Sequence, residues 1–215
     1  MLVGNKIVSF LKRNHINDIS IDKLFRIALE KSHQGEITVH PYGFHIVKIR
    51  VLPEYQLRLH IWLKGIRPMQ MPKWPPHDHN FDIDSMVLIG NMRHLTWKID
   101  NSSNNQGIIY EVAYKDNTSI LSKSDKLTGL ELEKDEVYPC GHVYHFKRGI
   151  FHSIEIPFEN VAATLCIASS YSDEPSRVFG ESGKLDKYEF TRSKVLPDSK
   201  DMIVQSIEAL EKIYV

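Results

Sequence analysis

The chain has 215 residues, and its 27 basic and 27 acidic side chains give a formal net charge of zero. Balanced charge provides no general attraction to polyanions, so we expect neither nucleic acid nor a membrane as a partner. No apolar run approaches the roughly 18 residues of a membrane span, and Asn5, Lys6 and Ser9 interrupt the start of the chain. The composition therefore favours a soluble, cytoplasmic protein, whose cysteines, Cys140 and Cys166, are reduced.

The first 35 residues predict two helices. Ile7, Phe10 and Leu11 fall on one face of a helix with its period of about 3.6 residues. Ser20 stands where a capping residue is expected, ahead of a second helix whose apolar residues begin at Leu24. We expect residues 1–35 to form a helical extension that packs on the outside of a core.

Residues 36–170 predict a series of short β-strands, because apolar and polar residues alternate from Glu36 onward. Gly90-Asn91 is typical of a hairpin turn, and residues 101–124 read as an insertion. About ten strands with turns between them indicate a closed or sandwiched antiparallel architecture. The predicted strands cover residues 37–39, 44–51, 57–63, 85–89, 93–99, 108–114, 127–132, 143–146, 153–156 and 161–168.

The last 45 residues, 171–215, predict a polar arm followed by a helix. Residues 171–197 show no period, which suits an extended arm or a lid. Residues 198–214 place Met202, Ile207 and Leu210 on one helical face, with Asp198 or Ser199 as the expected cap.

A histidine pair carries the functional signal. His77 and His79 are two residues apart, so on an extended strand both rings point to one side and Asp78 points to the other. His152, from a distant strand, could complete one face of a metal's coordination sphere. The open positions opposite such a face are where a redox or Lewis-acid metal meets substrate or dioxygen. The pattern therefore predicts a metalloenzyme.

These residues resemble the two motifs of the cupin superfamily, whose fold is the RmlC-like jelly roll. The first motif runs from His77 through Gly90, with Asp84 at the offset of five residues where an acidic ligand is expected, and the second is Lys147-Arg148-Gly149-Ile150-Phe151-His152. The resemblance implies a small antiparallel β-barrel over residues 36–170. It also implies a metal bound by His77, His79 and His152, with Asp84 either as a fourth ligand or, like Asp82, as a hydrogen-bond partner.

The histidine set is also distantly similar to three-histidine non-haem iron dioxygenases such as cysteine dioxygenase. The Ser-x-His-x-Tyr element of that enzyme would fall at residues 164–168, where this chain has Thr-Leu-Cys-Ile-Ala. A thiol substrate is therefore not expected.

Other side chains are candidates for contact with substrate. Arg58 and His60 share one face of their strand, and an inward Arg58 could bind a carboxylate. An outward Arg58 in solvent is the alternative, because strand register is not determined by sequence. Tyr144 shares a face with His142 just before the second motif, and could serve as acid, base or hydrogen-bond donor in catalysis.

The sequence thus predicts an all-β, cupin-type β-barrel or jelly roll with helices at both ends, and one divalent metal. We expect Fe(II), with Zn, Ni or Mn as other choices, and a dioxygenase that oxidises a small organic substrate with O2. Two alternatives stay open: a metal-dependent isomerase, epimerase or lyase, and a non-catalytic small-molecule-binding cupin. Oxygen consumption and metal content separate them.

A homodimer formed through exposed strands or the terminal helices is a further expectation.

Overall fold

The computed structural model describes residues 4–181 and 185–215. Residues 1–3 of the predicted helical extension and residues 182–184 of the predicted arm lie outside this range. Three helices occur in the described chain: α1 (Gly4–Arg13), α2 (Ile21–His33) and α3 (Pro197–Tyr214). The strands are β1 (Ile37–Val39), β2 (His45–Val51), β3 (Tyr55–Trp62), β4 (Asp82–Ile89), β5 (Met92–Ile99), β6 (Gln106–Lys115), β7 (Thr118–Tyr138), β8 (Val143–Phe146), β9 (Phe151–Glu155), β10 (Ala162–Ser169), β11 (Ser176–Gly180) and β12 (Lys187–Thr191).

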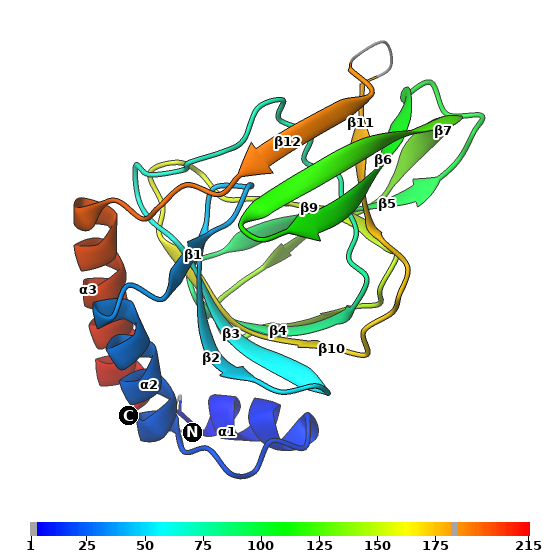
Figure 1. The fold of residues 1–215 in the computed structure, drawn as a ribbon. Coiled ribbons are helices and arrows are strands. Elements are labelled where there is room, and N and C mark those ends of the chain that lie inside the picture. Colours follow the sequence, from blue (N-terminus) through cyan, green and yellow to red (C-terminus); the bar gives the residue numbers. More distant parts are fainter. Residues whose placement is uncertain (1–3, 182–184) are drawn as a thin grey trace.

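The strands form two antiparallel sheets, and the expected all-β class is confirmed (Figure 1). The first sheet has the order β1-β2-β3-β10-β4-β8, and the second has the order β11-β6-β7-β5-β9, with β12 also paired to β7. The sheets form a sandwich of the jelly-roll type and are not closed into the barrel that the sequence suggested.

All three helices pack against the outer face of the first sheet (Figure 1). Their apolar sides meet alternate residues of the central strands, so helix and sheet share one core. Ser20 caps α2 as predicted, by accepting a hydrogen bond from the backbone nitrogen of Lys23. The cap expected for α3 was wrong, because Leu196 holds that position without a side-chain bond. The fully buried members of this core include Phe10, Leu24, Phe25, Leu57, Leu59, Ile61, Met86, Leu88, Leu165 and Ile207.

The turn at Gly90-Asn91 is a corner and not a hairpin. It joins β4 of the first sheet to β5 of the second, so the chain crosses between the layers there. Gly90 has φ +80°, and a side chain on it would collide with the carbonyl oxygen of Val161. Local sequence identifies the turn, but which sheet the second strand joins depends on distant partners.

The predicted arm, which read as irregular, contains regular strands. The predicted arm holds β11, which pairs with β6, and β12, which pairs with the start of β7. The insertion at residues 101–124 holds the strand expected at 108–114, which is part of β6, and also the beginning of β7, with which β6 pairs. On β12 the charged residues Lys187 and Glu189 are exposed, and they masked the alternation of this strand. The short β11 is buried at four of its five positions, so it shows no alternation.

No helix in the described ranges combines the length and the apolar composition of a membrane span.

His94 is buried on the cavity side of its sheet, and His45, which has the strand parity of Val47, is buried on the helix side of the first sheet. His45 and His94 are each 1% exposed, and neither ring nitrogen of His94 has a hydrogen-bond partner among the described residues. Burial lowers the pKa of His94 to about 3, with a smaller effect from His152 and His142. Burial also lowers the pKa of His45. The fold therefore holds these imidazoles neutral at pH 7.

Replacement of Phe25 by alanine tests the contact between helices and sheet. Phe25 is fully buried, so Phe25→Ala should lower the free energy of unfolding by about 3–5 kcal/mol. Ile213→Ala, at a site on α3 that is 51% exposed, should lower it by less than about 1 kcal/mol. Urea denaturation measures both values, and equal losses would contradict this core.

The stability of the metal-free protein should fall as the pH drops below the ordinary histidine pKa of 6.5 toward the folded value for His94, about 3. In that window the unfolded chain binds protons that the folded protein excludes, so acid favours unfolding. His94→Leu should make this slope shallower by up to about 1.4 kcal/mol per pH unit. Urea denaturation at about pH 7 and about pH 5, on either side of the ordinary histidine pKa of about 6.5, measures this slope. The variant His33→Leu, at an exposed histidine, is the control. Equal slopes in His94→Leu and wild type would refute this assignment.

Candidate metal centre

Backbone hydrogen bonds bring the three predicted ligands together. His77 and His152 exchange two such bonds, with nitrogen-to-oxygen distances of 3.1 and 2.8 Å, as directly opposed residues of an antiparallel pair. The nitrogen of Gly149 donates to the carbonyl oxygen of His79 at 3.0 Å. The segment before β4 is therefore attached to the turn between β8 and β9, although some seventy residues separate them.

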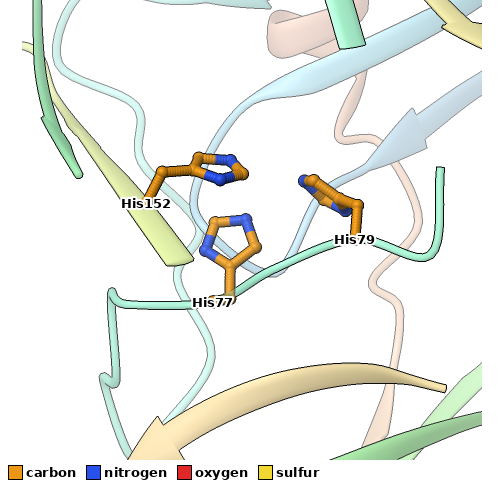
Figure 2. A group of neighbouring side chains, drawn as sticks. All are labelled: His77, His79 and His152. Atoms are coloured by element: carbon orange, nitrogen blue, oxygen red, sulfur yellow. The ribbon is translucent and has the colours of Figure 1, made fainter. Parts of the chain in front are cut away.

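The imidazole rings of His77, His79 and His152 converge on one space (Figure 2). Their ligand nitrogens all lie within 4.8 Å of one another. Nδ1 of His77 lies 2.8 Å from the carbonyl oxygen of Pro75, and Nδ1 of His152 lies 3.1 Å from that of Ile150. A carbonyl oxygen can only accept, so both Nδ1 atoms carry the proton and both Nε2 lone pairs are free. This is the arrangement in which metal-bound histidines are usually held.

Each of these rings also packs against an aromatic neighbour. The ring centroids are 4.3 Å apart for His77 and Tyr42, 4.7 Å for His79 and Phe81, and 5.0 Å for His152 and Phe146. Burial lowers the pKa of His77 to about 3 and that of His152 to about 4, and holds that of His79 well below its usual range. At neutral pH the site therefore presents three uncharged imidazoles, the form that binds a metal.

Asp78 points away from the three rings, as the alternation of side chains predicts. Its carboxylate is 2% exposed and accepts bonds from the backbone nitrogen and Nε of Arg177, at 2.5 and 2.6 Å. The Arg177 guanidinium lies over the ring of Phe151, 5.1 Å from its centroid. This partly buried ion pair joins the His77–His79 segment to β11, within the arm that sequence reasoning read as irregular.

The structure places Asp84 away from the three histidines, which corrects its assignment as a ligand. Asp84 lies on β4 and its carboxylate contacts Nδ1 of His145 at 3.1 Å. It has the strand parity of Met86, which packs under the helices, so it lies on the opposite side of the sheet from the three histidines. Asp82 instead stabilises the second motif, where it accepts bonds from Nζ of Lys147 and the backbone nitrogen of Arg148 at 2.8 and 2.9 Å.

The three histidines line a cavity of about 340 Å³ between the two sheets. Arg58, His60 and Tyr144 line the same cavity, so Arg58 is inward and the outward alternative is wrong. Nε2 of His60 is buried without a partner among the described residues. Tyr144 is 8% exposed and lies beyond Phe146 from His152, with ring centroids 5.4 Å apart for Tyr144 and Phe146.

Sequence reasoning missed several residues of the cavity. Lys48 could have been found, because it has the inward parity of Ile46 on the same strand. Arg192 could not, because it follows β12, which was not predicted. Phe81, next to Asp82 in the first motif, was read only as part of the motif and not as a wall of the cavity.

No protein-family model matches the chain, and no curated protein matches its sequence. Solved structures with partial similarity to this chain include an RmlC-like cupin from Methanocaldococcus jannaschii (11% identity, 60% of this chain and 83% of that one, TM-score 0.35). An RmlC-like cupin from Ralstonia eutropha JMP134 is 12% identical over 80% of this chain and 81% of its own, with a TM-score of 0.35. Hydroquinone 1,2-dioxygenase from Sphingomonas sp. TTNP3 is 16% identical over 62% and 68%, with a TM-score of 0.38.

At TM-scores below 0.5 these similarities carry no conclusion about the substrate or reaction of this chain. The fold assignment rests on the molecule itself. Two antiparallel sheets face each other, and both sequence motifs lie at turns where the chain crosses from one sheet to the other. The chain has a two-sheet antiparallel jelly roll, as its motifs predict, with a three-histidine group inside it.

Proposed function

We propose that this protein is a metal-dependent enzyme, a non-haem Fe(II) dioxygenase that acts on a small organic substrate. The observation that carries the proposal is the convergence of His77, His79 and His152, with ligand nitrogens within 4.8 Å, on the wall of an internal cavity. A structural role alone would not explain why three neutral imidazoles share one space beside a chamber large enough for a small molecule.

The donor set fits a divalent transition metal. Imidazole suits Fe, Zn, Ni and Cu, and the two protonated Nδ1 atoms fix the rings so that Nε2 faces the site. No carboxylate belongs to the group among the described residues, so the protein would hold the ion by histidine alone. Bound Fe(II) would supply the electrons with which dioxygen is activated, and the side of the ion toward the cavity would be open to substrate.

The residues of the cavity support roles in binding and proton transfer. Arg58 and His60 stand on one face of β3, where they would orient the substrate. Burial raises the pKa of the Tyr144 hydroxyl, so this group keeps its proton at neutral pH. Tyr144 would therefore act as a hydrogen-bond or proton donor to the substrate, and not as a base.

His79→Ala should abolish stoichiometric metal binding while the protein stays folded, because one of three ligand nitrogens is lost and the apolar core is untouched. Elemental analysis of protein purified anaerobically and supplied with Fe(II) measures this. His33→Ala is the matched control, because His33 is exposed at the end of α2. Stoichiometric metal in His79→Ala would contradict the proposed centre.

The Fe(II)-loaded protein should consume oxygen when its substrate is supplied, and the Zn(II)-loaded protein should not, because zinc has no accessible second oxidation state. An oxygen electrode with a panel of small organic acids, amides and alcohols measures the uptake. Product formed with zinc and without oxygen uptake would favour the isomerase, epimerase or lyase. Ligand binding without turnover on any metal would favour the binding module.

A further inference from the structure

The inner face of the first sheet carries two basic residues directly opposite each other. Lys48 on β2 and Arg58 on β3 are partners in the strand register, and both line the cavity. Like charges at opposed positions destabilise a sheet. Their retention on an inward face calls for a compensating negative charge.

The described residues around the cavity supply no such charge. The described residues that line the cavity include a third cation, Arg192, and neither aspartate nor glutamate. None of the three forms an ion pair in the described ranges 4–181 and 185–215. Acidic and basic residues are equal in number over the whole chain, so the overall composition does not explain the excess of positive charge in the cavity. The pKa of Lys48 is lowered by burial and then by the charges of Arg58 and Arg192, which agrees with their proximity.

The Arg58 guanidinium is held in place with one edge free. Oε1 of Gln56 accepts bonds from Nε and Nη2 of Arg58 at 3.1 and 2.9 Å, and Nη2 also approaches the Tyr171 hydroxyl at 3.4 Å. Its Nη1 donates to no group among the described residues. A guanidinium ordered in this way is prepared to bind a planar carboxylate.

An aromatic wall connects these cations to the three histidines. The Cζ atom of Arg58 lies 5.0 Å from the ring centroid of Phe81, and that ring stacks on His79 at 4.7 Å. Farther along the sheet, Phe44 stacks on Trp62 at 4.5 Å. One ring thus separates the guanidinium from a predicted metal ligand, a span that a small molecule can bridge.

We propose that the cavity binds a small organic carboxylate, with its carboxylate at Lys48, Arg58 and Arg192 and its apolar body along the aromatic wall toward His79. The proposal deepens the function proposed above and rests on it for the reaction, but carboxylate binding itself needs no metal. The cavity of about 340 Å³ limits the ligand to a small molecule.

Calorimetric titration of the chelator-treated, metal-free protein tests the binding directly. Benzoate is compared with benzamide, and hexanoate with hexanamide, because each pair differs mainly in charge. At least one carboxylate should bind about tenfold or more tightly than its amide, the scale of one charge-assisted hydrogen bond. Inorganic phosphate, an anion with no apolar body, should bind more weakly than benzoate.

Charge-removing variants locate the site. Arg58→Met and Lys48→Met should each weaken carboxylate binding by about tenfold to a hundredfold, and should change amide binding by less than about threefold. Lys48 is solvent-exposed over much of its surface, although its ammonium is partly desolvated by the cavity. Its variant should therefore fold even if Arg58→Met does not. Lys64→Met is the matched control, because Lys64 is exposed and lies outside the cavity lining.

Three results would overturn the proposal: amides that bind as tightly as carboxylates, unchanged carboxylate binding in Lys48→Met, or phosphate that binds as tightly as benzoate. The metal-free His79→Ala variant should retain carboxylate binding. Loss of metal binding with intact carboxylate binding would therefore concern the three-histidine site alone. Loss of carboxylate binding with intact metal binding would concern Lys48, Arg58 and Arg192 alone.

Discussion

The pair of backbone hydrogen bonds between His77 and His152 is the contact on which the candidate site depends. It brings two segments together at the one register that directs both rings into the same space. The bond from Gly149 to His79 and the Asp78–Arg177 ion pair attach the same segment on two further sides. Because these restraints are backbone bonds and a partly buried ion pair, the geometry of the histidines does not rely on the metal to assemble it.

The first sheet separates stability from chemistry by the alternation of its strands. One face packs under three helices and forms the main core, while the other faces the cavity. The inner face carries polar and charged groups that a core would exclude, such as Lys48, Arg58 and the unpartnered Nε2 of His60. Buried polar groups without partners cost free energy. The large apolar outer face provides the stability that lets the inner face keep them for a ligand.

The same separation explains the electrostatic character of the cavity. Removal from water lowers the pKa values of His77 and His152, so the three-histidine group is neutral and carries no charge of its own at pH 7. The cations stand at one end and the imidazoles at the other, with aromatic rings between them. A ligand with one negative end and an apolar body matches this order, and its charge would fix which end reaches the histidines.

Sequence by itself determined the residue types and their local spacing: the pair His77 and His79, the later His152, the terminal helices and the two-residue period of β2, β3 and β10. It determined these because side-chain alternation is a local property. Tertiary structure alone decided which sheet each strand joins, that Asp84 faces the opposite side from the three histidines, and that β11 and β12 complete the second sheet. These depend on pairing between residues far apart in the chain, and a shift of one residue in register would reverse every facing side chain.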